Sequence, residues 1–259
     1  MDFVTHLQGN VDSDLTPLFL VHAISGLSLP YLHLKSFRSI GLDGKSLDRP
    51  VYGINSPIYI SHNYSVPKSF EKLATLYITK IKTIQAHGPY LLGGWSFGGM
   101  LAVKMAEALL AQGETVLRVI ILDSGNPETF PAFKSEAEHK ALTEATYNQI
   151  IAISTALHTD GRNSPDNTSS ESRTSSESEL NEDDESSLVD NIHLAKLIRR
   201  HISDAFLVLS NQGQRGFLSE KLDTHVVLIK CKTTLQIDNT ALLNRSAYML
   251  GLMRDKFMD

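Results

Sequence analysis

The main candidate for covalent chemistry in this sequence is Ser96, at the centre of the motif Gly94-Trp95-Ser96-Phe97-Gly98. The pattern G-x-S-x-G on its own is a weak signal. Here it follows the apolar, strand-like run 90–95 and opens the apolar, helix-like run 97–113. A serine on a tight turn from a strand into a helix presents its hydroxyl as a nucleophile. We therefore predict Ser96 as a nucleophile; the alternative is a glycine-rich turn that carries an idle serine.

The two glycines of the motif and the start of the helix add physical detail to this prediction. Side chains two residues before and after the serine would collide where the strand and helix backbones approach, so Gly94 and Gly98 are needed there. The amino end of the helix 97–113 directs positive partial charge at the site. That charge favours a reaction in which a negatively charged oxygen develops.

A serine nucleophile needs a carboxylate and a histidine, and Asp123 is placed to supply the carboxylate. It ends the apolar run 115–124, which is the next strand-like segment after Ser96. The carboxyl ends of neighbouring parallel strands lie on one rim of a sheet, where such sites form. Asp123 would orient a histidine and stabilise its charged form. The alternative is an aspartate that only starts the turn 124–127.

The order of the segments predicts an α/β fold. Strand-like and helix-like segments alternate, which is typical of a mostly parallel sheet, and the continuous apolar run 115–124 is typical of a strand covered on both faces. The helical stretch within 128–215 predicts a lid over the sheet, inserted in a single domain, 1–259. The strand-like segments are 17–23, 51–56, 90–95, 115–124 and 225–231; the helix-like ones are 29–39, 66–88, 97–113, 134–158, 189–212 and 240–257.

Residues 159–187 differ from the rest of the chain in composition. They contain nine serines, nine acidic residues and two arginines, which gives a net charge of 2 − 9 = −7. A segment with one large apolar residue cannot bury enough surface to offset the entropy of ordering. We therefore predict a disordered insertion within the lid.

Composition also limits the class of protein. The net charge of −5 argues against nucleic-acid binding, which needs a basic surface. The single cysteine, Cys231, allows no disulfide framework and no thiolate metal site. The first residues carry acids where a signal peptide has a basic region, and no apolar run reaches the length of a membrane span. We expect a cytoplasmic protein that holds no metal.

Three stretches of the sequence together resemble a known family: PLFLVHAISG, GPYLLGGWSFGGMLAVKMAEALLAQG and VIILDSGNP. They are similar to the type I thioesterase domains of fungal-like polyketide synthases and nonribosomal peptide synthetases, over residues 17 to about 131. The resemblance implies the α/β-hydrolase fold and assigns Ser96 as nucleophile and Asp123 as triad acid. It also implies an oxyanion hole built from the backbone N–H groups of Ile24 and Phe97.

The same resemblance implies a substrate and partner. The acyl, polyketide or peptide chain would arrive on the phosphopantetheine of an acyl or peptidyl carrier protein, or on a small thiol, and the enzyme would need no cofactor of its own. Hydrolysis, cyclisation and transfer are all open as the releasing step. His22 matches a loop residue of the family, and we expect it to be a buried, hydrogen-bonded histidine, not the base.

The histidine of the triad is where the sequence departs from the family pattern, in which it follows the last strand of the sheet. The histidines after Asp123 are His139, His158, His193, His201 and His225. His225 opens a strand and should therefore lie at the end of the sheet opposite Ser96, whereas His193 and His201 should lie on a solvated helical face. We expect the last strand and the histidine loop to be absent. Three explanations stay open: a longer natural chain, a catalytically impaired acyl-binding protein, or His201 or His193 acting as the base.

Overall fold

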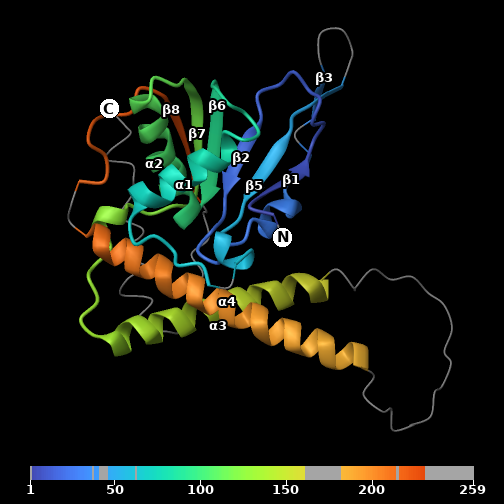
Figure 1. The fold of residues 1–259 in the computed structure, drawn as a ribbon, viewed down its shortest axis with the longest axis vertical. Helices are drawn as coiled ribbons and strands as arrows, with labels where there is room; N and C mark the ends of the chain where they lie inside the picture. The colour runs from blue at the N-terminus through green and yellow to red at the C-terminus, as the bar shows by residue number, and fades with distance from the viewer. Residues whose placement is uncertain are drawn as a thin grey trace, which may run out of the picture.

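A six-stranded sheet forms the centre of the computed structural model, which describes residues 2–36, 38–40, 46–61, 63–160, 182–213 and 216–230 (Figure 1). The strand order is β1-β5-β2-β6-β7-β8. The strands are β1 (Val4–Gln8), β2 (Leu18–Val21), β5 (Val51–Ile54), β6 (Tyr90–Trp95), β7 (Val116–Leu122) and β8 (His225–Ile229), and β3 (Arg38–Ile40) pairs with β4 (Ser46–Asp48) in a separate two-stranded sheet.

Parallel pairing dominates the large sheet, as the alternation of segments predicts. β2 pairs in parallel with both β5 and β6, and β7 pairs in parallel with both β6 and β8. β1 is antiparallel to β5 and matches no predicted strand. Its sequence, VTHLQ, is short and mixed in polarity, so it carries no strong strand pattern.

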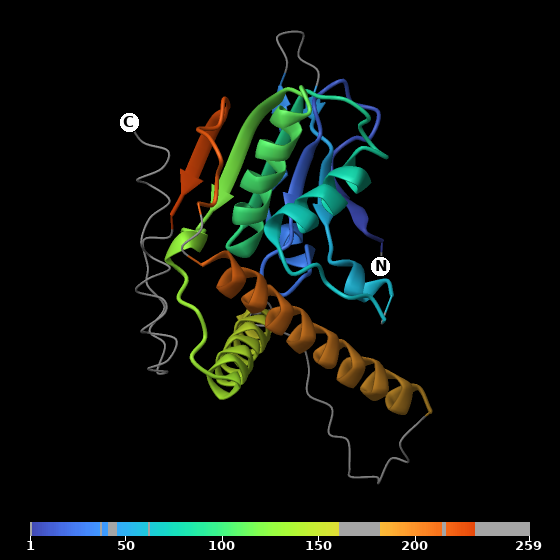
Figure 2. The same ribbon diagram turned by 60° about the vertical axis from the view of Figure 1, so that its left-hand side comes forward.

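Two helices cover one face of the sheet, and Figure 2 shows them side by side. They are α1 (Phe70–Ile81) and α2 (Phe97–Ala111). The hydroxyl of Ser69 accepts a hydrogen bond from the Lys72 N–H at 3.3 Å and so caps α1. α1 is shorter than the predicted segment 66–88, because the chain leaves the helix in turns after Ile81.

The segment 29–39 does not form the predicted helix. It contains the short 3₁₀ helix η1 (Leu29–His33) and the start of β3 at Arg38. Pro30 fits the first turn of a helix, but five residues with few apolar contacts do not sustain a longer one. The other 3₁₀ helices are η2 (Pro57–Tyr59) and η3 (Pro127–Thr129).

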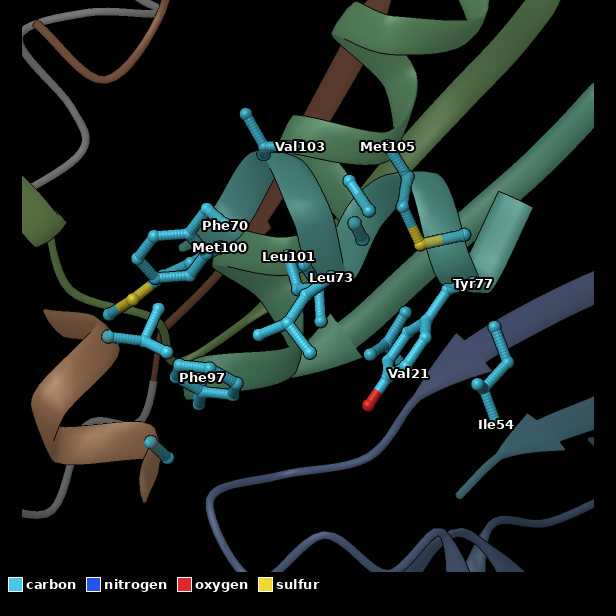
Figure 3. Close-up of a cluster of buried hydrophobic side chains, with 14 of the residues drawn as sticks. Val21, Ile54, Phe70, Leu73, Tyr77, Phe97, Met100, Leu101, Val103 and Met105 are labelled. Carbon is cyan, nitrogen blue, oxygen red and sulfur yellow. The ribbon is translucent and has the colours of Figure 1, made fainter. Parts of the chain in front are cut away.

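The main core lies between the sheet and the pair α1 and α2 (Figure 3). Tyr77 from α1 and Phe97 from α2 are almost fully buried in it, and the Phe97 and Phe70 ring centroids are 5.3 Å apart. Burying one such apolar side chain contributes about 1.5–3 kcal/mol to the free energy of unfolding. Phe97 directly follows Ser96, so this packing also fixes the position of the serine.

The opposite face of the sheet is less covered within the described residues. Ile120 and Leu122 of β7 are half-buried there, and Leu117 is 44% exposed. Among the described residues, β7 is fully covered on the face of α2, where Val119 and Ile121 are fully buried; whether residues after Lys230 cover the other face lies outside the described part of the chain.

Two long helices cross the carboxyl ends of the parallel strands; Figure 2 shows the arrowheads of β7 and β8 directed toward them. They are α3 (Glu136–Asp160) and α4 (Glu182–Gln212), which pack on each other. Helices predicted at 134–158 and 189–212 are thus confirmed. Both extend into the segment predicted to be disordered, which is helical at 159–160 and at 182–187. Acidic residues suit the first turn of a helix, so the composition of 182–187 does not oppose one.

Several predictions fall outside the described residues. These are the centre of the acidic segment, 161–181, and everything after Lys230, including the expected helix 240–257 and the expected absence of a last strand and histidine loop. Among the described helices, none is long and apolar enough to cross a membrane.

Candidate active site

Ser96 occupies a sharp turn between β6 and α2. Its backbone has φ 54° and ψ −119°, a left-handed conformation that a residue with a side chain rarely adopts. Its N–H donates to the carbonyl oxygen of Leu122 at 2.8 Å, which ties the turn to the end of β7. Its hydroxyl does not cap α2. The predicted strained turn is therefore present, and the hydroxyl is not used to hold the helix.

Glycines surround this turn because backbones touch there. A Cβ on Gly94 would overlap the backbone of Gly98, and a Cβ on Gly98 would overlap the carbonyl oxygens of Val21 and His22. Backbone atoms cannot move aside as the end of a flexible side chain can. Both glycines are thus required by close packing, as the sequence predicts, and the turn of Ser96 is in direct contact with the loop that follows β2.

Asp123 lies at the carboxyl end of β7, next to the turn of Ser96. Its backbone φ is 46°, and its N–H donates to the carbonyl oxygen of Ile229 at 2.7 Å. Its carboxylate forms an ion pair with Lys230, with 3.3 Å between Oδ1 and Nζ. Lys230 directly follows β8, so the register of β7 and β8 brings the two residues together. Reasoning from the sequence alone missed this partner.

A shallow hollow of about 300 Å³ borders Asp123. Its lining is mostly apolar, and Asp123 and Lys230 are its charged members. Trp95, which directly precedes Ser96 in the chain, lines this hollow and is 39% exposed. The lining residues are Pro30, Tyr31, Leu34, Trp95, Leu122, Asp123, Ile229 and Lys230.

Residues 22–26 form the loop after β2, which we call the oxyanion loop after its predicted role. Several carbonyl oxygens of this loop accept hydrogen bonds. The Ala23 carbonyl accepts the Gly26 N–H at 3.0 Å, the Ser25 carbonyl accepts the Tyr59 hydroxyl, and the Gly26 carbonyl accepts the Ser56 N–H at 2.8 Å. The first-turn N–H of Phe97 at the start of α2 has no partner within its own helix. Phe97 directly follows Ser96, and Ile24 lies two residues after His22, whose carbonyl oxygen touches the turn at Gly98.

His22 is fully buried and hydrogen-bonded at both ring nitrogens, which confirms the expectation. Its Nδ1 lies 2.7 Å from the Ala23 carbonyl oxygen and its Nε2 lies 2.6 Å from the Tyr77 hydroxyl. Because a carbonyl only accepts, Nδ1 carries the proton and Nε2 accepts from Tyr77. Burial, followed by the proximity of His201, lowers the pKa of His22 to about 3.

His201 does not lie on a solvated face, and that prediction is wrong. It is 1% exposed, and its Nδ1 donates to the Ile24 carbonyl oxygen at 3.0 Å. Burial lowers the pKa of His201 to about 4. The signal was present in the sequence: Ile198, Ile202 and Ala205 are spaced as one apolar face of α4, and His201 falls on that face.

The other histidines lie away from this loop or are not described. His139 bonds the Ser203 carbonyl at 3.0 Å between the two lid helices, and His193 is exposed on α4. His225 pairs with Arg118 at the amino end of β7, which confirms that it lies opposite Ser96. The side chain of His158 is outside the described residues. Within the described part of the chain, no group of three or more histidine, cysteine or acidic residues is arranged to hold a metal ion.

Comparison with known families and proteins gives consistent matches. A family model described as "Thioesterase domain" matches residues 16–207. The thioesterase pytI of Aspergillus terreus is 40% identical over 243 residues, which cover 89% of this chain and 77% of that protein. A non-reducing polyketide synthase of Pseudevernia furfuracea, PFUR17_0229, is 42% identical over 130 residues, which cover 50% of this chain and 6% of that synthase.

Solved structures agree on the fold. The NocB thioesterase domain, solved as a covalent complex with a fluorophosphonate nocardicin G analogue, has a TM-score of 0.56 at 22% identity and covers 96% of this chain and 86% of its own. The four-domain nonribosomal peptide synthetase AB3403 has a TM-score of 0.62 at 20% identity and covers 98% of this chain and 18% of its own. The chain therefore has the α/β-hydrolase fold with a helical lid.

Proposed function

The chain belongs to the thioesterase domain family, and we propose that it cleaves acyl thioesters through a covalent acyl intermediate on Ser96. The observation that carries this proposal is the strained turn of Ser96. Its backbone φ is 54°, and its hydroxyl does not cap helix α2. Strain of this kind costs on the order of 1–3 kcal/mol and is kept at sites where it presents a reactive group.

The proposed reaction has two half-steps. Ser96 Oγ attacks the thioester carbonyl carbon while a general base takes its proton, and the C–S bond then breaks as the thiol leaves with a proton. Water, or an internal nucleophile of the acyl chain, then attacks the acyl-serine and regenerates the hydroxyl. The N–H groups of Ile24 and Phe97 would stabilise the oxyanion of each tetrahedral intermediate. His22 is not the base, because both its ring nitrogens are already bonded.

Asp123 would orient the base and stabilise its charged form. Its position supports this role, since the Ser96 N–H bonds the residue directly before Asp123. Lys230, 3.3 Å away, holds the carboxylate on the rim of the sheet. The hollow that Asp123 borders with Trp95 and Leu122 is mostly apolar, which suits contact with an acyl chain.

The substrate class is a further part of the proposal. Fungal thioesterases and polyketide synthases are similar to this chain in sequence, which favours an acyl chain of secondary metabolism carried on the phosphopantetheine of a carrier protein. We place the reaction in the cytoplasm.

A fluorophosphonate probe tests the nucleophile directly. We expect the full chain to be labelled at Ser96 and expect Ser96→Ala to remain unlabelled. Turnover of an acyl N-acetylcysteamine thioester should be lost in the same variant. Labelling of the wild type that is no faster than that of Ser96→Ala would overturn the proposal. Tight binding of the thioester without turnover, unchanged in Ser96→Ala, would instead identify an acyl-binding protein.

A further inference from the structure

His201 connects the lid helix α4 to the oxyanion loop through one partly buried hydrogen bond. Its Nδ1–H donates to the Ile24 carbonyl oxygen at 3.0 Å, across two segments far apart in the chain. The ring lies against the ring of His22, with 4.9 Å between centroids, and against that of Tyr59 at 6.5 Å. The imidazole side of this bond is buried, so a polar Nδ1–H left without its acceptor would be costly there.

The loop is shaped to receive this ring. Gly26 has φ +82°, and a Cβ there would lie 2.7 Å from Cγ of His201. The absence of a side chain at position 26 therefore makes the space that the imidazole fills. Because the loop backbone and α4 fit each other this closely, the position of the helix and the conformation of the loop depend on each other.

The two histidines fix the two peptide groups on either side of Ile24. In a trans peptide the N–H points opposite to the C=O of the same group. His22 holds the Ala23 carbonyl, and this carbonyl belongs to the same peptide as the Ile24 N–H. His201 holds the Ile24 carbonyl and so fixes the following peptide. Without the second bond, the Ile24–Ser25 peptide could rotate about ψ of Ile24, and the loop would lose one of the two histidine contacts that hold the backbone on either side of Ile24.

We propose that His201 is a positioning residue through which α4 anchors the backbone at Ile24, so that the Ile24 N–H stays where the oxyanion needs it. This inference rests on the proposed role of Ile24 in the oxyanion hole. It makes seating of the lid helix a condition for a formed oxyanion hole. His201 then acts through Ile24 and does not serve as the base: its Nδ1 is bonded to a carbonyl and its ring is enclosed by His22 and Gly26.

Two variants of similar size separate this role from simple packing. His201→Asn keeps an N–H donor near the position of Nδ1, whereas His201→Leu fills the space without one. With an acyl N-acetylcysteamine thioester we expect kcat of His201→Leu to fall on the order of tenfold to a hundredfold, since complete removal of an oxyanion donor costs about a hundredfold to a thousandfold and a displaced donor retains part of its effect. KM should change less than about twofold, and His201→Asn should recover most of kcat.

A second measurement does not depend on turnover. Amide hydrogen exchange in residues 22–26 of the free protein should become about tenfold faster or more in His201→Leu and stay near the wild-type rate in His201→Asn. If His201→Leu does not fold, His201→Gln, whose amide lies one bond further from the backbone, takes its place. His139→Leu is the matched control, because His139 makes a similar bond to a carbonyl, that of Ser203, away from the loop.

The outcomes are distinct. Equal loss of kcat in the asparagine and leucine variants, or unchanged exchange of residues 22–26 in the leucine variant, would overturn the positioning role. A wild type that shows no Ser96 labelling overturns the proposed function instead, while the exchange measurement still decides whether α4 holds the loop.

Discussion

The imidazole rings of His22 and His201 meet edge to face, with centroids 4.9 Å apart and an interplanar angle of 87°. One ring comes from the loop after β2 and the other from the lid helix; Nδ1 of His22 bonds the Ala23 carbonyl oxygen, and Nδ1 of His201 bonds the Ile24 carbonyl oxygen. Burial lowers the pKa of His22 to about 3 and that of His201 to about 4. Both rings are therefore neutral at physiological pH.

This pair predicts a loss of stability in mild acid. The ordinary histidine pKa of 6.5 applies in the unfolded chain, which binds protons below that pH, whereas folded His201 binds one only near pH 4. The stability from each neutral histidine is therefore complete above about pH 6.5 and declines as the pH falls toward the folded pKa. The slope is at most about 1.4 kcal/mol per pH unit for each histidine.

Urea unfolding of the wild type and His201→Asn between pH 7.5 and 4 measures this slope. Asparagine does not titrate, so the free energy of unfolding of the variant should depend less on pH over the window from about 6.5 to 4. His22 is present in both proteins, as are Tyr59 and the α4 neighbours Arg200 and Asp204. Parallel pH profiles for the two proteins would contradict the lowered pKa of His201.

We expect the Ser96→Gly protein to have a larger free energy of unfolding than the Ser96→Ala protein. Its φ of 54° strains any residue with a Cβ, and glycine relieves this strain. Relief of about 1–3 kcal/mol, less about 0.5–1 kcal/mol for the greater freedom of glycine in the unfolded chain, leaves Ser96→Gly ahead of Ser96→Ala by about 1 kcal/mol. Urea unfolding measures the difference.

A helical serine provides the control for that comparison. Ser203 lies within α4, where glycine should be less stable than alanine by about 1 kcal/mol. The difference in free energy of unfolding between the glycine and alanine variants should thus have opposite signs at positions 96 and 203. If Ser96→Gly is also less stable than Ser96→Ala, the turn stores no strain at this residue.

The reactive turn could be predicted from the sequence because its constraints are local. A glycine two residues before and after Ser96, between an apolar strand and an apolar helix, already dictates that backbones meet there. The burial of His201 and the ion pair of Asp123 with Lys230 depend instead on how α4 and β8 pack against the rest of the chain. Contacts between distant segments leave only weak marks in a single sequence, such as the apolar spacing around His201.

Gly98→Ala should unfold the protein or nearly so. The added methyl group would overlap the carbonyl oxygens of Val21 and His22, which belong to the backbone of the central strand β2 and its loop. The expected cost is about 3 kcal/mol or more, since backbone shifts are needed to relieve it. Circular dichroism and urea unfolding of the purified variant measure the loss.

Gly113→Ala is the matched control for that overlap. Gly113 follows α2 with φ +76°, and nothing lies within 4 Å of a Cβ added there. Only the conformational strain remains, on the order of 1–2 kcal/mol. Equal losses at positions 98 and 113 would show that close packing of the turn on β2 contributes nothing.

Asp123→Asn should separate catalysis from stability. Asparagine keeps the shape of the side chain and tolerates the backbone φ of 46°, but it removes the charge that would stabilise the base. We expect labelling of Ser96 by a fluorophosphonate to slow on the order of a hundredfold or more. The free energy of unfolding should change by less than about 1 kcal/mol, because the ion pair with Lys230 is partly exposed, with Asp123 at 35%.

Asp223→Asn, before β8 at the opposite end of the sheet, should leave both quantities unchanged. Labelling of Asp123→Asn at the wild-type rate would reduce Asp123 to a residue that only shapes the turn after β7.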